Sequence, residues 1–217
     1  TCFGSVKLAS RRAALCRADI GAPEDVQRLI QGLQSETAPL KGVFHLAMVI
    51  DDAPLSALTS ERLRTVMAPK AHGAWLLHEN TKDLELDCFV MFSSVSSIFG
   101  NPAQGNYAAA NAFMDCFMAD RTARVAKGER KGHSLSIGWT LWADGGMRVS
   151  DRVLRGMTGR MGTDPLPTDQ ALAVFLDVLD GALPPRVVAG QGDAARFLRF
   201  LSKGDEAERP PTGVTPT

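Results

Sequence analysis

The sequence predicts an α/β fold in which helices cover both faces of a doubly wound parallel sheet. This prediction rests on four short runs rich in apolar strand formers, at residues 42–49, 87–92, 134–141 and 183–189. Near-continuous apolar runs are typical of parallel strands that are buried on both faces. Longer segments with helical periodicity separate the runs, and this alternation of strand and helix indicates the doubly wound class.

Four segments are expected to form helices: residues 24–33, a stretch beginning at Ser60, residues 107–125 and residues 168–179. The first begins beside Pro23 and Asp25, residue types that favour the amino end of a helix. The third is the longest, and it carries a run of alanines before its larger apolar side chains.

The composition is that of one large globular domain. The chain has 217 residues, of which 45% are hydrophobic and 22% charged, and this length is sufficient to bury a substantial core. After residue 200 the composition shifts to Glu, Lys, Pro, Thr and Gly. We therefore expect a domain over residues 1–200 and a linker or disordered tail over residues 201–217.

Charge and cysteine usage exclude several classes of function. Lys plus Arg and Asp plus Glu both number 24, so no overall field would attract nucleic acid or an anionic membrane. Neither a signal peptide nor a membrane-spanning run is evident, and the cytoplasm is the expected location. The four cysteines are widely spaced without a CxxC pair, so we predict no metal site and no disulfide framework.

Four residues could form one site at the carboxyl ends of the strands, where ligands bind in this class of fold. Ser94 follows the second predicted strand, and Tyr107 and Asn111 open the longest helix, one turn apart on a shared face. Lys70 lies in the preceding helical region. Each residue has an ordinary structural interpretation, as a turn, a helix cap or a surface charge, but together they fit proton transfer to a carbonyl oxygen.

That chemistry assigns a different task to each side chain. A free tyrosine has a pKa of ~10, and a nearby ammonium would lower this value toward neutrality. A serine hydroxyl can donate a hydrogen bond to the same carbonyl oxygen, and an asparagine can orient a lysine or a water. A hydride must come from a cofactor, because no side chain supplies one.

The stretch FVMFSSVSSIFGNPAQGNYAAANAFMD, residues 89–115, resembles the catalytic core of modular polyketide synthase ketoreductases, members of the short-chain dehydrogenase/reductase superfamily. The flanking segments GVFHLAMVIDDAPL, APKAHGAWLLHE and SIGWTLWADGGM agree in order and spacing. The similarity runs from about residue 18 to about residue 189. The superfamily usually places lysine four residues after the tyrosine, whereas Asn111 stands there and Lys70 lies upstream, as in polyketide ketoreductases.

The resemblance implies NADPH-dependent reduction of a β-ketoacyl thioester, carried on an acyl carrier protein, to the β-hydroxyacyl thioester. It implies a Rossmann-like sheet and a catalytic tetrad of Lys70, Ser94, Tyr107 and Asn111. In this scheme Tyr107 is the proton donor, Ser94 holds the carbonyl oxygen, Lys70 depresses the tyrosine pKa and Asn111 supports the proton relay. Other domains of the same synthase are the further partners implied.

The amino end departs from the family pattern. The family begins with a strand and a Gly-rich turn that binds the cofactor pyrophosphate, and no such motif occurs in this sequence. Residues 8–12 resemble the end of the family's second strand, where Arg11 would meet the 2′-phosphate of NADPH, and residues 14–20 resemble its third strand. Asp19 and Ile20 match the pair that contacts adenine. His45 and Ala47 match cofactor-contacting positions, although Met48 replaces the usual glycine.

Short sequence motifs also resemble those of the B type of this family. Residues 50–52 read Ile-Asp-Asp, as in the motif before the lysine helix, and Pro102 and Asn106 stand five residues and one residue before the tyrosine. Asp51, Asp52, Pro102 and Asn106 would guide the substrate, although Pro102 and Asn106 could also simply shape a turn. The B type implies a D-configured β-hydroxyl.

Two other functions remain open on the sequence. The missing Gly-rich turn is compatible with a non-catalytic, truncated ketoreductase that acts as a scaffold or interaction piece. A free-standing short-chain reductase of small carbonyl compounds is the third alternative. The exchanged lysine and asparagine, Lys70 and Asn111, and the linker-like tail argue against it.

Overall fold

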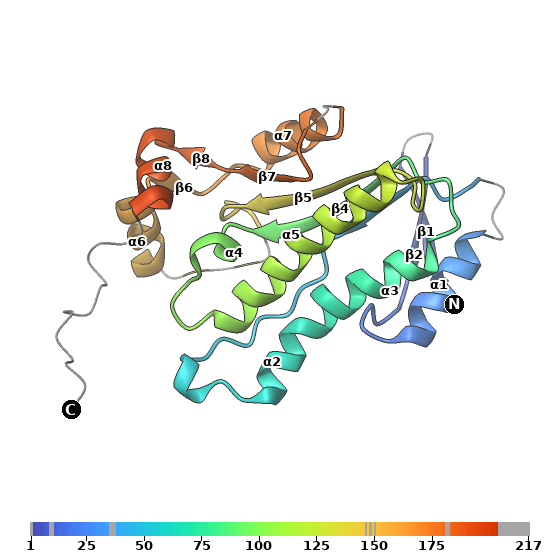
Figure 1. The fold of residues 1–217 in the computed structure, drawn as a ribbon, viewed down its shortest axis with the longest axis horizontal. Helices are drawn as coiled ribbons and strands as arrows, with labels where there is room; N and C mark the ends of the chain where they lie inside the picture. Colours follow the sequence, from blue (N-terminus) through green and yellow to red (C-terminus); the bar gives the residue numbers. More distant parts are fainter. Residues whose placement is uncertain are drawn as a thin grey trace.

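The structure is a computed structural model, and it describes residues 2–8, 11–34, 38–145, 147, 149, 151–180 and 183–203. Its centre is a four-stranded parallel sheet in the order β3-β4-β5-β7 (Figure 1). The strands span Gly42–His45 (β3), Cys88–Ser94 (β4), His133–Trp139 (β5) and Arg186–Ala189 (β7). The predicted α/β class and the parallel sheet are confirmed.

The remaining elements surround this sheet. They are β1 (Cys2–Leu8), β2 (Arg11–Cys16), α1 (Pro23–Gln34), η1 (Leu55–Ala57), α2 (Ser60–Met67), η2 (Ala68–His72), α3 (Gly73–Asn80), α4 (Ser96–Phe99), α5 (Gly105–Ala126), α6 (Asp151–Met161), β6 (Thr163–Asp164), α7 (Thr168–Asp180), β8 (Gln191–Gly192) and α8 (Ala194–Lys203).

Helices pack on both faces of the sheet, as Figure 1 shows. Successive side chains of β4 point to opposite faces, because a strand has a period of two. Phe89 and Met91 join the core formed with α1, α3 and α5, and Val90 and Phe92 join the core formed with β5 and α7. Strand β4 therefore contributes to both cores, which explains its near-continuous apolar run, whereas β3 contributes to the first core and β5 and β7 to the second.

The strand ends differ from the sequence prediction for local reasons. β7 begins at Arg186 rather than residue 183, because Pro184 and Pro185 cannot donate ladder hydrogen bonds. β3 ends at His45 rather than residue 49, and the chain beyond it leaves the sheet. β4 extends to Ser94, which lies opposite Trp139 of β5, so the serine stands at the carboxyl edge of the sheet.

The amino-terminal strands differ from the expected family arrangement. We predicted that residues 14–20 would form a strand resembling the family's third strand, but β1 and β2 form an antiparallel hairpin of their own. Strand pairing is decided by the available partner and its register, which the local sequence does not specify. Among the described residues, β3 pairs only with β4, so its other edge has no ladder partner there.

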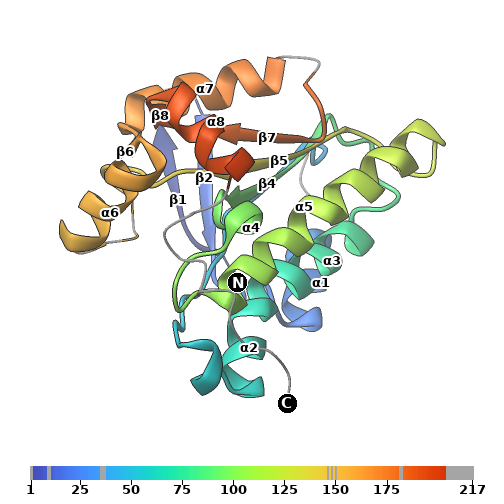
Figure 2. The same ribbon diagram turned by 60° about the vertical axis from the view of Figure 1, so that its left-hand side comes forward.

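The carboxyl-terminal elements gather at one end of the sheet, where α6, β6, β8 and α8 lie together (Figure 2). β6 and β8 pair antiparallel through Thr163 and Gly192. Gly192 has φ of 134°, and a Cβ there would lie 2.0 Å from Gly162 O, so this crossing requires glycine. Helix α8 continues to Lys203, past the predicted domain boundary at residue 200, and most of the predicted tail lies outside the described residues.

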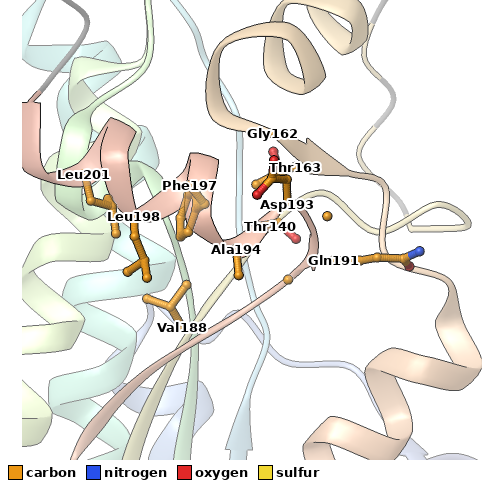
Figure 3. A pocket seen from close by; sticks show the side chains of 12 residues that line it. Thr140, Gly162, Thr163, Val188, Gln191, Asp193, Ala194, Phe197, Leu198 and Leu201 are labelled. Carbon is orange, nitrogen blue, oxygen red and sulfur yellow. The ribbon is translucent and has the colours of Figure 1, made fainter.

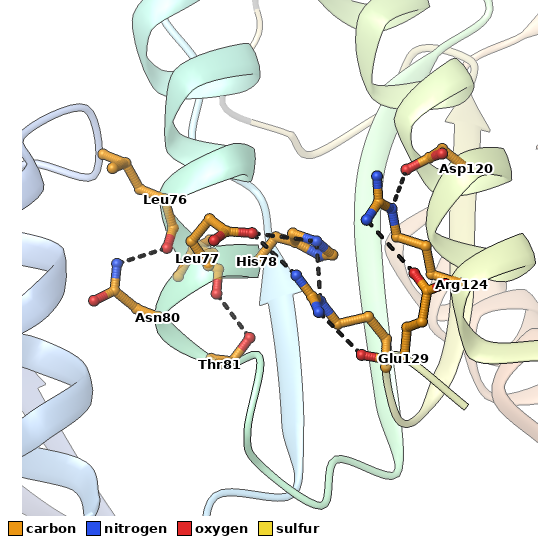
Figure 4. Close-up of polar contacts among 10 residues, drawn as sticks. Leu76, Leu77, His78, Asn80, Thr81, Asp120, Arg124 and Glu129 are labelled. Carbon is orange, nitrogen blue, oxygen red and sulfur yellow. Dashed lines mark hydrogen bonds and ion pairs between the residues drawn. The ribbon is translucent and has the colours of Figure 1, made fainter. Parts of the chain in front are cut away.

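Polar contacts join the end of α3 to the loop after α5 (Figure 4). Arg130 donates to His78 Nε2 at 3.1 Å and to Glu79 Oε1 at 3.0 Å. Burial and the neighbouring Arg130 charge lower the pKa of His78 to about 4, which keeps its ring neutral and able to accept this bond. In the part of the chain that the structure describes, no helix combines the length and apolarity needed to cross a membrane.

Candidate active site

A cavity of about 910 Å³ lies beyond the carboxyl ends of β4 and β5. Its walls come from the segment after β3, the α4 turn, the start of α5 and helix α6. Three of the four predicted catalytic residues line it: Lys70, Ser94 and Tyr107. The volume lies within the range of ligand-binding pockets, and most of the lining is apolar.

Lys70 reaches this cavity from a π-helical turn, η2, that interrupts the helix running from Ser60 to Asn80. Such turns are frequent at functional sites. The side chain is 2% exposed, and its ammonium donates to Phe92 O at 3.1 Å and lies 5.4 Å from the centroid of the Tyr107 ring. Burial lowers the pKa of Lys70 to about 8, while the negative charge of Asp115 raises it.

Tyr107 occupies the first turn of α5 and is 5% exposed. Its backbone N–H donates to Asn106 Oδ1 at 2.9 Å, which supplies a partner for an otherwise orphan amide. Burial raises the pKa of Tyr107, and hydrogen bonding from the Asn111 and Ser94 side chains lowers it by less. The prediction of a lowered tyrosine pKa is therefore wrong for this structure, because desolvation outweighs the polar neighbours.

Ser94 ends strand β4, and its hydroxyl faces the cavity. Its Oγ accepts a hydrogen bond from Ser96 N at 3.2 Å. This contact orients the oxygen at the point where the chain turns into α4. The Ser94 O–H remains able to donate to a ligand atom in the cavity.

Asn111 does not line the cavity and is fully buried. The side-chain Nδ2 of Asn111 donates to Tyr107 O at 2.8 Å, and its backbone carbonyl oxygen accepts from Ser93 Oγ at 3.4 Å. Its Oδ1 is buried and has no hydrogen-bond partner among the described residues. A buried acceptor without a protein partner is a natural position for a bridging water.

The four predicted substrate-guiding residues come from two loops that are tied together and, for Asn106, from the first turn of α5. Gln104 Nε2 donates to Asp52 Oδ2 at 2.8 Å, and Asn106 Nδ2 donates to Asp51 O at 2.8 Å. Asp52 and Pro102 line the cavity, whereas Asp51 and Asn106 do not. Asn106 is fully buried and joins the two loops.

The predicted cofactor-binding residues are not brought to this cavity. Asp19 is exposed, and its carboxylate accepts from Gly21 N at 2.8 Å. Ile20 packs against the core that includes α3, Ala47 is half-buried outside the lining, and the Arg11 side chain lies outside the described part of the structure.

His45 faces the lysine turn instead. It is 3% exposed, its Nε2 lies 2.9 Å from Pro69 O, and burial, with the Lys70 charge adding to it, lowers its pKa to about 4. Leu46 and Met48 from the same segment line the cavity in place of His45 and Ala47. Side chains alternate along an extended chain, so Leu46 and Met48 face the cavity while a cofactor contact by His45 or Ala47 stays a prediction.

Some residues at the site were not anticipated. Helix α6 contributes Gly156, Arg160 and Met161 to the lining, although its sequence was not recognised as a helix. Asp115, on the face of α5 that carries Tyr107 and Asn111, is 4% exposed. The signal for Asp115 was present in the sequence, since an acid at this spacing in an apolar helix must have a buried partner.

A second, smaller cavity of about 310 Å³ lies between β7 and α8 (Figure 3). Apolar side chains of α8, among them Phe197, Leu198 and Leu201, form one wall. It contains none of the predicted catalytic residues, and Thr140 lines both cavities. The proposed chemistry therefore belongs to the larger cavity.

Comparison with known proteins agrees with this geometry. A family model described as "KR domain" matches residues 6–144. Polyketide synthase ThaG of Burkholderia thailandensis is 44% identical over 196 residues, which is 89% of this chain and 3% of that protein. The chain therefore spans only a small part of this much longer relative.

Solved structures are similar over most of the chain. A ketoreductase domain from the bacillaene assembly line has 34% identity and a TM-score of 0.80, covering 86% of this chain and 45% of that one. A structure described as A-type ketoreductases from a modular polyketide synthase has 32% identity and a TM-score of 0.74, covering 91% and 39%. Matches of this extent show that the chain belongs to the KR domain family, the ketoreductase domains of polyketide synthases.

Proposed function

We propose that this chain carries the catalytic residues for NADPH-dependent reduction of a β-ketoacyl thioester, held on an acyl carrier protein, to the β-hydroxyacyl thioester. The observation that supports this most directly is the buried Lys70 ammonium, 5.4 Å from the Tyr107 ring centroid, at a cavity that also contains Ser94. Burying the charge of a lysine is unfavourable unless the ammonium is paired or hydrogen-bonded. Titratable groups with perturbed pKa values in a cleft are typical of active sites.

The residues present fit the nicotinamide end of the cofactor. Lys70 makes one hydrogen bond among the described residues, to Phe92 O, so its remaining N–H groups can bind ligand hydroxyls. NADPH, when bound, would supply the hydride. The adenine end is supported less well, because Asp19 and Ile20 do not line the cavity.

The proton steps follow from the environment of each side chain. The raised pKa of Tyr107 keeps its phenol protonated near neutral pH, so it can donate a proton to the ketone oxygen as the hydride arrives. Ser94 donates a hydrogen bond to the same oxygen. The Lys70 ammonium stabilises the phenolate left behind, and a water at Asn111 Oδ1 would resupply the proton.

The substrate arm is proposed to enter past the two joined loops. The bond from Ala53 N to Ala103 O, at 2.8 Å, fixes their backbones against each other. Asp52 and Pro102 face the cavity from this side. A fixed entry path presents one face of the ketone to the hydride. With the Ile-Asp-Asp segment and Asn106, these residues support the B type and a D-configured β-hydroxyl, which is 3R with ordinary substituent priorities.

The test is ketoreduction by the full-length polypeptide that carries this chain, with a β-ketoacyl thioester on an acyl carrier protein as substrate. We expect NADPH oxidation coupled to formation of the D-hydroxyl, measured by chiral analysis of the product. The Tyr107→Phe variant should retain NADPH binding and lose about a thousandfold in kcat, the order of effect of a general acid. The exposed Asp120→Asn variant of the same helix is the control.

Two outcomes would overturn parts of this proposal. Wild-type rates from Tyr107→Phe would refute the assigned proton donor. A dominant L-hydroxyl would refute the B-type assignment and leave ketoreduction in place.

A further inference from the structure

Helix α5 carries a buried carboxylate that the proton steps above do not use. Tyr107, Asn111 and Asp115 follow one another at intervals of four residues, so they share one face of the helix. All three are buried. Asp115 is 4% exposed, and a buried aspartate requires partners that stabilise its charge.

Asp115 obtains these partners from three other elements. Its Oδ1 accepts from Ser136 Oγ of β5 at 2.6 Å, and its Oδ2 accepts from Ser97 Oγ of α4 at 2.6 Å. Arg186 of β7 forms an ion pair with Oδ2 at 3.1 Å and also donates to Ser97 Oγ at 3.2 Å. Short hydrogen bonds to a charged acceptor are the stronger kind, so this carboxylate joins four elements.

The bond to Ser97 matters most for the site. Ser97 belongs to α4, a four-residue helix that directly follows the turn after Ser94. So short a helix is not stable by itself. The Ser97–Asp115 bond holds this turn against α5, which carries Tyr107.

The same carboxylate acts on Lys70 through its charge. Asp115 favours the protonated form of Lys70, which burial disfavours. The other titratable groups facing Lys70 are His45, whose pKa is lowered to about 4, and Tyr107. The Asp115 charge raises the pKa of Lys70, although the same carboxylate is also paired with Arg186.

We propose that Asp115 is a positioning residue of the active site: it fixes the Ser94 turn against the helix that carries Tyr107. This inference rests on the proposed function for its catalytic consequence. Its structural part can be measured without activity, because Tyr107 is the chain's single tyrosine. Ultraviolet titration of the phenolate therefore reports on this site alone.

The first experiment compares serine variants that remove bonds of equal length. Hydrogen bonding from Ser94 lowers the pKa of Tyr107, so displacement of the turn should raise it further. We expect Ser97→Ala to raise the titration midpoint measurably and Ser136→Ala to leave it unchanged, with circular dichroism confirming the fold at each pH. A Ser97→Ala midpoint equal to that of wild type would overturn the Ser97 connection. A Ser136→Ala shift as large as that of Ser97→Ala would also overturn it, because Asp115 would then have only a general structural role.

The second experiment uses Asp115→Asn, which keeps the shape and removes the charge, with Asp120→Asn as control. We expect the Tyr107 midpoint to rise. In the full-length polypeptide, kcat should fall about tenfold, the order expected for weakening one charge-assisted hydrogen bond, with little change in KM. The alkaline limb of kcat should also move to lower pH, because the Asp115 charge raises the pKa of Lys70. An unchanged midpoint together with an unchanged pH profile would overturn the proposal.

The two proposals fail in different ways. If the wild-type polypeptide shows no ketoreduction, the proposed function fails while the titration still tests the positioning role. If Asp115→Asn does not fold, the two serine variants decide the question by themselves.

Discussion

The two ends of helix α5 both bury strongly polar groups, but they differ in how many hydrogen bonds those groups make and in whether they line the larger cavity. At the carboxyl end, Arg121 is 1% exposed, donates to the carbonyl oxygens of Lys131 and Gly132 and to Ser134 Oγ, and lies 4.5 Å from the centroid of the Phe89 ring, while its Nε has no partner among the described residues. At the amino end, Lys70 makes one hydrogen bond among the described residues, and Asn111 Oδ1 makes none there.

This difference separates a structural polar cluster from a functional one. The guanidinium of Arg121 is held mainly by backbone carbonyls, and Arg121 lines neither of the two cavities described above. At the amino end, Lys70 lines the cavity of about 910 Å³, and Lys70 and Asn111 retain unused donors and acceptors. A folded protein keeps such unused groups where a ligand or water completes them.

The carboxyl end should therefore dominate stability. Replacing Arg121 with Met removes the charge and leaves its acceptors unpaired, which should lower the free energy of unfolding by about 3 kcal/mol or more. Arg124→Met on the exposed side of the helix, where Arg124 pairs with Asp120 and Glu129, should cost less than about 1 kcal/mol. Urea unfolding measures both. A loss for Arg121→Met no larger than that of the control would contradict the structural assignment.

The amino end should show the opposite balance between stability and function. Burial lowers the pKa of Lys70 to about 8 from an ordinary value of 10.5. Between these two values the unfolded chain binds more protons than the folded chain, so stability should rise with pH across this window, by about 3 kcal/mol in total. Lys70→Met should lack this rise, unfold at higher urea than wild type at pH 7, and lose ketoreduction.

Lys82→Met, at an exposed lysine, is the matched control and should change stability by less than about 0.5 kcal/mol. A Lys70→Met protein that is less stable than wild type at pH 7 would show that the lysine is part of the scaffold. The comparison between the two ends of α5 would then fail.

The sequence specified the amino end better than the carboxyl end. The spacing of Tyr107 and Asn111 on one helix face follows from helical geometry alone, and Ser94 follows from its place after an apolar run. Lys70 required the family resemblance, because no local pattern brings it to Tyr107. Arg121 looked like one of many surface charges, since its partners are backbone carbonyls of a loop that the sequence does not mark.

The amino-terminal hairpin was not predicted, and the cofactor contacts stay predictions. The pairing of β2 with β1 depends on which strand lies beside it, and periodicity does not contain that information. Asp19 and Ile20 were assigned from the resemblance, yet neither lines the cavity. Spacing within one element thus predicted which residues share a helix face, whereas the position of residues that depend on distant segments did not follow from the sequence.

The smallest effect concerns the acid sensitivity of the carboxyl end. Burial lowers the pKa of His78 to about 4 from 6.5, with the charges of Arg130 and Arg121 adding to the shift. Between pH 6.5 and 4 the unfolded chain binds the proton first, so this group should make stability fall as the pH falls through that window. We expect about 2 kcal/mol by pH 4, because Arg130 and Glu79 are partly exposed and salt screens their charges.

His78→Gln keeps an acceptor for Arg130 and removes the titration. Urea unfolding from pH 7 to pH 4 should show a shallower loss of stability than in wild type. His45 has a pKa lowered to the same value, so His45→Gln should remove a similar part of the loss of stability at acid pH. The double variant should show the shallowest dependence of stability on pH.

The two single variants should also differ in their effect on the amino end of α5. His45→Gln disturbs the contact with Pro69 O beside Lys70 and should shift the Tyr107 titration, whereas His78→Gln should leave that titration unchanged. A shift of that titration by His78→Gln would mean that the two ends of α5 are coupled, which their separate sets of contacts do not predict.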